Sequence, residues 1–92
     1  MTVPARSRYL ERMGNPLTSQ LATRACDRYN AMCTRDPDGS ILPALAWRAI
    51  GVRLWAASHA LAGDARSFQR GRASDAHRRA DYAGQLARRP AA

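Results

Sequence analysis

The chain has 92 residues and a formal net charge of +8, from 15 basic and seven acidic side chains. A chain of this length buries only about 60% of its unfolded surface and forms one domain with a small core. We therefore expect a single small helical domain over residues 1–92, with residues 1–14 and 88–92 flexible. The sequence contains no complete catalytic or cofactor motif, so we expect neither an enzyme nor a bound cofactor.

All 15 basic residues are arginines, and they are concentrated toward the two ends of the chain. Residues 1–35 contain six arginines and two acidic residues, residues 36–65 two and three, and residues 66–92 seven and two. The planar guanidinium group pairs with phosphate and carboxylate and stays charged at any cellular pH. The distribution therefore predicts an anionic partner rather than a substrate.

The first predicted helix covers Pro4–Met13 and ends at Gly14. Asn15-Pro16 then predicts the start of a second helix that reaches about Thr34, because Asn is a good N-cap and Pro suits the first helical position. Its apolar stripe recurs every three or four residues and consists of Leu17, Leu21, Ala25, Tyr29 and Met32. The residues that follow, Asp36-Pro37-Asp38-Gly39, predict a tight turn.

The third predicted helix runs from about Ile41 to Ala62, and its segment 43–62 is the predicted centre of an all-α bundle of three to four short helices. Apolar residues recur with helical spacing on two of its faces. One face carries Trp47, Ile50, Leu54, Ala57 and Leu61, and the far side carries Ile41, Leu45, Val52 and Trp55. The rest of the chain has few large side chains, so we expect a homo-oligomer such as a dimer, or a docked partner, to cover the second face.

The last predicted helix starts after Gly63, has Asp64 as its N-cap and reaches about Arg89 before Pro90. A break is expected at Gly71, because glycine disfavours a helix interior. Alanines repeat along this helix with the spacing of a coiled-coil seam, at Ala73, Ala76, Ala80, Ala83 and Ala87. Such a seam permits close approach of a second helix but buries little area.

The segment from Ile41 to Ala62 is long enough to cross a bilayer, but Arg48 and Arg53 near its centre would each cost about 2.5–3.5 kcal/mol on insertion. The basic N-terminal residues run into polar ones rather than into an apolar stretch, unlike a secretory signal. We therefore expect a cytoplasmic protein and no membrane span.

A metal site is not expected from the cysteines and histidines. Cys26 and Cys33 are seven residues apart on a predicted helix, or about 10.5 Å along its axis, too far for one zinc ion or an intrahelical disulfide. His59 and His77 follow at intervals that match no usual zinc spacing. The turn after the second helix resembles the middle of an EF-hand loop, but Leu45 stands where the bidentate Glu should be.

The leading functional hypothesis is a non-enzymatic protein whose arginine-rich helices bind the phosphate backbone of nucleic acid, mainly without sequence readout. Arg70-Gly71-Arg72 resembles the core of an AT-hook, although Ala73 stands where that motif has proline. A solvated, solubilising helix face is the simpler reading of the same charges. The predicted nucleic-acid-binding residues are Arg66, Arg70, Arg72, Arg78, Arg79, Arg88 and Arg89.

The alternative hypothesis is a small regulator or inhibitor of the phage or mobile-element type, which acts by binding a host protein complex. Short length, no catalytic motif and an uncovered apolar face suit such a protein equally well. Its predicted partner-binding residues are Arg48, Val52, Trp55 and His59, which share the second face of the third helix. Adsorption to an acidic lipid surface is a third reading of the basic helices.

Overall fold

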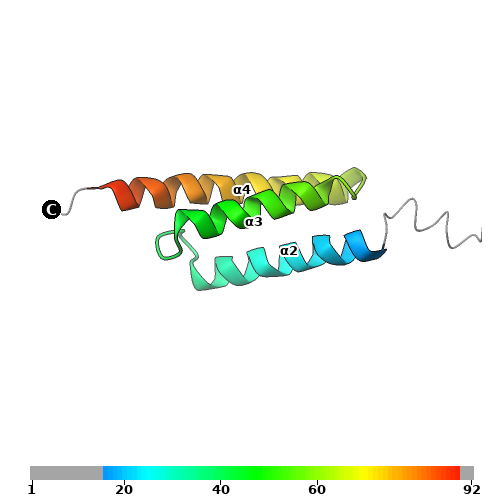
Figure 1. Cartoon of the computed structure of the whole chain (residues 1–92), viewed down its shortest axis with the longest axis horizontal. Helices are drawn as coiled ribbons and strands as arrows, with labels where there is room; N and C mark the ends of the chain where they lie inside the picture. The colour runs from blue at the N-terminus through cyan, green and yellow to red at the C-terminus, as the bar shows by residue number, and fades with distance from the viewer. Residues whose placement is uncertain (1–15, 90–92) are drawn as a thin grey trace, which may run out of the picture.

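The computed structural model describes the backbone of residues 16–89 and the side chains of residues 20–89. It contains three helices, α2 (Pro16–Arg35), α3 (Ala44–Ser58) and α4 (Gly63–Arg88), and no strand within that range. The helices run up, down and up, with α3 and α4 side by side and α2 along the other side of α3 (Figure 1). The predicted all-α class is confirmed. The predicted helix Pro4–Met13 and residues 90–92 lie outside the described range.

The second predicted helix and the turn after it are confirmed. Helix α2 begins at Pro16 and ends at Arg35. The amide of Gly39 donates to the carbonyl oxygen of Asp36 at 3.2 Å, and the φ of Gly39 is +77°, a conformation that glycine adopts without strain. Helix α2 buries Ala25 and Met32 from its predicted stripe.

Helix α3 begins at Ala44, just after Pro43, and ends at Ser58, four residues before the predicted end at Ala62. The Ser58 hydroxyl donates to the carbonyl oxygen of Trp55 at 2.6 Å, a local bond that competes with helix propagation. The amide of Leu61 then bonds back to Ser58 in a tighter three-residue turn. Gly63, with a φ of +59°, reverses the chain into α4.

The core lies between α3 and α4. Trp47, Ile50 and Leu54 are almost fully buried, as predicted for the first face of this helix. They pack against the alanine seam of α4, where Ala73, Ala76, Ala80 and Ala83 are buried and Ala87 is exposed. Small side chains on one helix let the large ones on the other approach closely. This pairing explains how a chain with few large apolar residues still forms a core.

Two predictions about α4 are wrong. The helix is continuous through Gly71, because glycine in an exposed helix interior costs only about 1 kcal/mol and the packed alanines on both sides outweigh it. Asp64 is not the N-cap, because the helix begins at Gly63 and Ala62 occupies the N-cap position. Asp64 instead lies in the first turn, where a negative charge favours the helix dipole.

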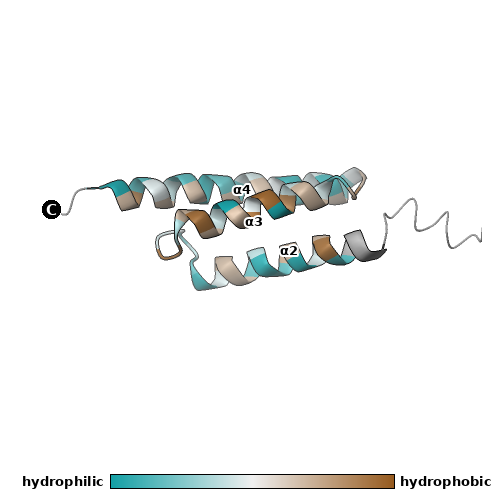
Figure 2. Cartoon of the chain, viewed as in Figure 1, coloured by the Kyte–Doolittle hydropathy of each residue, from teal (hydrophilic) through white to brown (hydrophobic). Residues whose placement is uncertain are grey.

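The second apolar face of α3 is largely exposed in the described part of the chain. Leu45 is 76% exposed, Val52 56% and Trp55 44%, and Ile41 just before the helix is also exposed. Figure 2 shows the most hydrophobic stretches of the ribbon in α3, whereas α4 is largely hydrophilic. No helix in residues 16–89 combines the length and the apolar character needed to cross a bilayer.

Candidate partner-binding face

The predicted arginine set of α4 does not form one free surface. Three of its members, Arg66, Arg70 and Arg79, donate to other groups of the chain. Their contacts fix the ends of α3 and the turn after α2. The phosphate-binding hypothesis therefore loses part of the set on which it was based.

Arg66 closes the C-terminal end of α3. Its Nε donates to the carbonyl oxygen of Leu61 at 2.7 Å, and its Nη2 donates to that of His59 at 3.2 Å. The carbonyl groups just beyond a helix end lack helical partners, and a cation placed there also favours the helix dipole. Arg66 thus stabilises the connection between α3 and α4.

Arg79 connects α4 to the turn after α2. Its Nε donates to the Asp75 carboxylate at 2.8 Å, and its Nη1 donates to the carbonyl oxygens of Asp36 and Pro37 at 3.1 and 3.2 Å. Its guanidinium carbon lies 4.9 Å from the centre of the Trp47 ring, within cation–π range. Because Arg79 is this deeply engaged, we regard it as structural.

Asp36 is the fully buried acceptor at the centre of this region. Its carboxylate accepts from the amides of Ile41 and Leu42 at 3.0 and 2.8 Å and from the Trp47 indole at 3.4 Å. Burial alone would raise the pKa of Asp36, but these hydrogen bonds outweigh it and lower the pKa. The acidic turn that resembled a calcium loop is therefore an anchor for the chain entering α3.

Tyr29 of α2 and Asp75 of α4 form a second connection between helices. The Tyr29 hydroxyl donates to the Asp75 carboxylate, and the Tyr29 ring meets Trp47 edge to face with centroids 6.4 Å apart. Burial and this hydrogen bond raise the pKa of Tyr29. Burial would also raise the pKa of Asp75, but its bonds to Tyr29 and Arg79 outweigh burial and lower it. Residue spacing alone did not reveal this pair, which is 46 positions apart.

Trp55 lies toward the C-terminal end of this exposed face of α3, and Arg70 of α4 covers one side of its ring. The Arg70 guanidinium carbon is 4.6 Å from the centre of the Trp55 ring, and the His59 ring meets Trp55 edge to face at 6.2 Å. Arg70 Nε donates to the Ser58 hydroxyl at 3.1 Å, while Nη2 lies 3.4 Å from His59 Nδ1. Arg70, which was predicted to bind nucleic acid, thus lies against Trp55 and His59, which were predicted to bind a partner protein.

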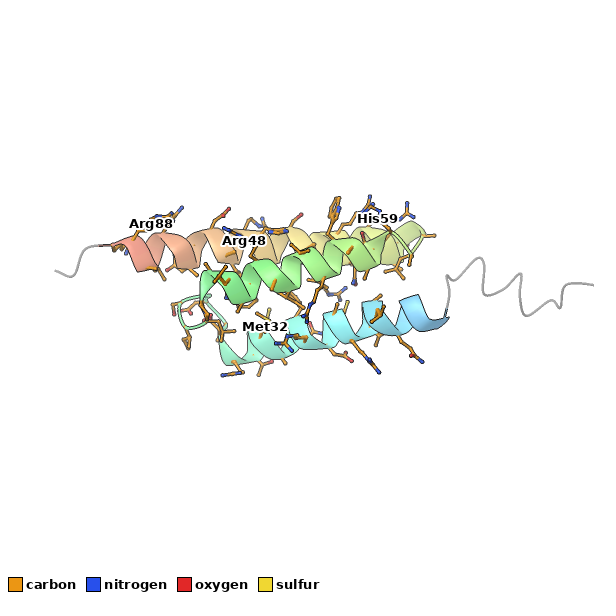
Figure 3. All side chains as sticks on the ribbon, in the orientation of Figure 1. Met32, Arg48, His59 and Arg88 are labelled. Carbon is orange, nitrogen blue, oxygen red and sulfur yellow. The ribbon has the colours of Figure 1, made fainter. Side chains whose placement is uncertain are left out.

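We call this surface the Trp55 face and define it by Arg48, Val52, Trp55, His59 and Arg70. The first four are exposed and the fifth is partly exposed. Figure 3 places Arg48, His59 and Arg88 along the same edge of the α3–α4 pair. The face therefore combines an indole and an aliphatic side chain with guanidinium groups.

The other four arginines of the predicted set point to different parts of the surface. Arg78 is exposed and lies 3.8 Å from the Asp75 carboxylate, whereas Arg72 lies beside Phe68 on the side of α4 nearest Tyr29. Arg88 and Arg89 are exposed at the end of α4. The Arg70-Gly71-Arg72 sequence is helical, unlike the extended strand an AT-hook inserts into a minor groove.

The cysteines are free thiols. Cys26 donates to the side-chain oxygen of the buried Gln69 at 2.6 Å, and burial raises the pKa of its thiol. In the part of the chain that the structure describes, no three potential metal-binding side chains gather at one place. We therefore assign Cys26 and Gln69 to the contact between α2 and α4.

Comparisons with models of protein families, with curated proteins and with solved structures returned no match. The function of the chain therefore has to be argued from its own residues.

Proposed function

We propose that the chain is a non-enzymatic binding protein that attaches to a partner protein through the Trp55 face. The observation that supports this most is the exposed Trp55 ring, held between Arg70 and His59 beside Val52. Trp and Arg are the residue types most often found where protein interfaces gain their binding energy. An uncovered aromatic and aliphatic surface of this kind is typical of a protein-binding site.

The contacts around Trp55 reduce the cost of binding. A side chain that is already fixed by its neighbours loses little conformational freedom when a partner covers it. Arg70 is bonded to Ser58 and lies over the indole, so both groups are ordered before any partner arrives. The face is therefore suited to a preformed rather than an induced contact.

The positive charge of the Trp55 face favours an acidic partner surface. Arg48 and Arg70 contribute positive charge beside the apolar side chains, and the whole chain carries +8. We therefore propose a partner surface with an apolar centre and acidic residues around it, because such complementarity steers association and disfavours other partners. A regulator or inhibitor that blocks a functional surface of its partner needs no catalytic residues.

Co-purification from the native cell tests this proposal. Trp55→Ala should remove a partner protein that co-purifies with the unaltered chain, as judged by quantitative mass spectrometry. Phe68→Ala is the matched control, since Phe68 is 68% exposed but lies on the side of α4 near Tyr29. The proposal is wrong if both variants retain the same partners.

Binding of nucleic acid is the second candidate function. It is favoured by Arg72, Arg88 and Arg89, whose side chains make no hydrogen bond or ion pair within the described range, and by the exposed Arg78. Its test is fluorescence anisotropy with random-sequence oligonucleotides across a salt series, where duplex binding should show a slope of about −0.9 per phosphate contacted. The variant for this test replaces Arg72, Arg78, Arg88 and Arg89 and spares the structural Arg79.

A further inference from the structure

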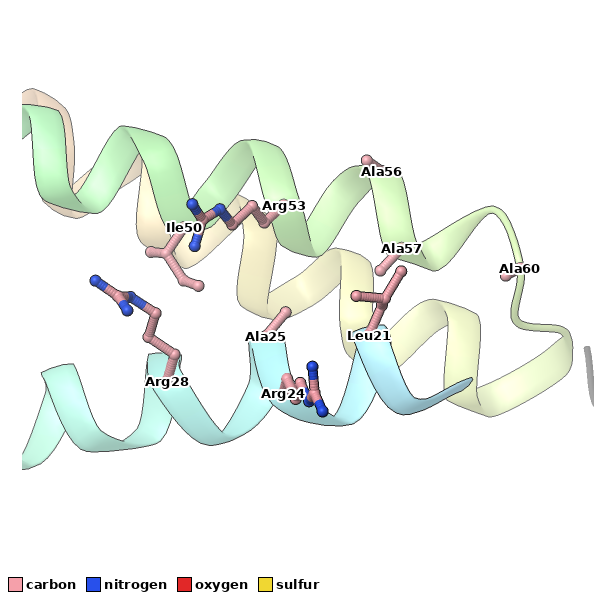
Figure 4. A pocket seen from close by; sticks show the side chains of 9 residues that line it. All are labelled: Leu21, Arg24, Ala25, Arg28, Ile50, Arg53, Ala56, Ala57 and Ala60. Carbon is pink, nitrogen blue, oxygen red and sulfur yellow. The ribbon is translucent and has the colours of Figure 1, made fainter. Parts of the chain in front are cut away.

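A groove separates the N-terminal half of α2 from α3, on a different side of α3 from the Trp55 face. It has a volume of about 620 Å³. Its floor is formed by Leu21 and Ala25 of α2 and by Ile50 and Ala57 of α3, which Figure 4 shows on the two facing helices. The groove is therefore apolar along its base.

Gln69 of α4 contacts α2 beside the groove. The buried Gln69 of α4 accepts from Cys26 at 2.6 Å and donates to the carbonyl oxygen of Ala22 at 3.5 Å. Leu21 is 52% exposed although its helical spacing predicted a core position. An exposed apolar side chain thus forms part of the groove lining.

Three arginines line the groove, Arg24 and Arg28 from α2 and Arg53 from α3 (Figure 4). Across residues 20–89, the ion pairs are those of Asp75 with Arg78 and Arg79, so none of the three has an acidic partner there. All three are exposed. Three guanidinium groups around an apolar floor favour a ligand that has both an apolar and an anionic surface.

We propose that this groove binds an acidic amphipathic helix of a partner protein. Leu21 and Arg28 are seven residues apart on α2, or about 10.5 Å along the axis, the same rise that separates positions i and i+7 of a docked helix. Apolar side chains of the partner would lie on Leu21 and Ala57, and its carboxylates would pair with the arginines, ideally in two-pronged contacts.

The positive charge and the apolar floor of the groove argue against three other occupants: residues 1–15 of this chain, a second copy of the chain, and nucleic acid. Residues 1–15 of this chain contain three arginines and one glutamate, so they would place positive charge against the three groove arginines. A second copy of the chain carries the same net charge of +8. Nucleic acid would satisfy the arginines but would leave the apolar floor without a partner. An acidic amphipathic helix satisfies both features.

The test uses the full chain and a fluorescent peptide of about 16 residues, with leucines at positions i, i+3, i+4 and i+7 and glutamates between them. Binding is followed by anisotropy, and its location by the NMR signals of the Ile50 and Leu21 methyl groups. The peptide should bind and shift both signals, and Arg24→Glu with Arg53→Glu should weaken binding by about tenfold or more. A scrambled peptide of the same composition should bind much more weakly.

The matched control is Arg35→Glu with Arg89→Glu, which changes the net charge equally at exposed positions outside the groove. This control variant should retain most of the affinity for the peptide. The proposal fails if the control weakens binding as much as the groove variant, or if the peptide shifts signals of the Trp55 face instead. It also fails if an oligonucleotide displaces the peptide and shifts the Ile50 signal. A third contrary result would be NMR contacts between Ile50 and residues 1–15 in the free chain, which would show that this segment occupies the groove.

Because this groove and the Trp55 face lie on different sides of α3, each proposal can fail alone. Loss of the groove interaction would leave the Trp55→Ala result unaffected.

Discussion

Arg79 of α4 donates through Nη1 to the main-chain oxygen of Asp36 at 3.1 Å, although the two residues are 43 positions apart. This bond joins the last helix to the turn that follows the first described helix. Trp47 lies between them, with its indole nitrogen bonded to Asp36 and its ring beneath the Arg79 guanidinium. The most basic helix of the chain therefore uses one of its arginines to close the fold.

Arg79→Ala should lower the free energy of unfolding by about 1–3 kcal/mol, because it removes the hydrogen bonds that Arg79 donates to the carbonyl oxygens of Asp36 and Pro37 and to the Asp75 carboxylate. Arg78→Ala should change it by less than about 0.5 kcal/mol, since exposed ion pairs contribute little. Urea denaturation followed by circular dichroism measures both. Equal effects would mean that Arg79 is not structural.

Asp36 should make the stability of the fold sensitive to acid. Its pKa is lowered in the folded chain, so its stabilising contribution is complete above the ordinary carboxyl pKa of about 3.9 and is lost as the pH falls below it. Asp36→Asn should reduce stability at pH 7 and flatten this acid loss in denaturation curves at several pH values. Asp81→Asn is the control, because Asp81 is exposed. An unchanged acid profile in Asp36→Asn would contradict this account.

Tyr29 should have the opposite pH dependence. Its pKa is raised by burial and by the bond to Asp75, so its contribution is present below the ordinary tyrosine pKa of about 10 and is lost as the pH rises above it. Tyr29→Phe should remove part of the alkaline destabilisation that the unaltered chain shows in thermal unfolding between pH 8 and pH 11. Tyr82→Phe, at an exposed position, should retain it.

The packing of α3 on α4 can be tested with the same substitution at two glycines. A Cβ at Gly71 would meet nothing within 4 Å, whereas one at Gly51 would lie 3.0 Å from the His77 ring. Both alanines gain about 1 kcal/mol of helix propensity. Gly71→Ala should therefore stabilise the chain, and Gly51→Ala should be about 1–3 kcal/mol less stable than Gly71→Ala because His77 must move. Equal melting temperatures would show that this contact is loose.

Helical spacing in the sequence predicted the parts of the fold that depend on one helix alone. The burial of Trp47 and of the alanine seam follows from residues three and four apart, and the turn at Gly39 follows from local residue preferences. The break expected at Gly71 is missing because packing on both sides outweighs a small local cost. Leu21 is exposed although it belongs to the predicted apolar stripe of α2, because helical spacing does not specify how the helices pack against one another.

The site was predicted less completely, because its contacts join residues that are distant in sequence. Arg70 and Arg79 belong to the same run of charges, yet one lies over Trp55 and the other over Trp47. Charge alone cannot distinguish an arginine held by the fold from one that is free to bind. The position of Arg79 four residues after Asp75 was the available signal for an internal role of that arginine.

Photo-crosslinking at Val52 tests the central claim most directly. The chain is produced in its native cell with p-benzoylphenylalanine at position 52, or at the exposed position of Asn30 on α2 as a control. We expect a discrete protein adduct from position 52 that is absent from position 30 and is lost when Trp55→Ala is added. Adducts to nucleic acid, or the same protein adducts from both positions, would contradict the assignment of the Trp55 face as a protein-binding surface.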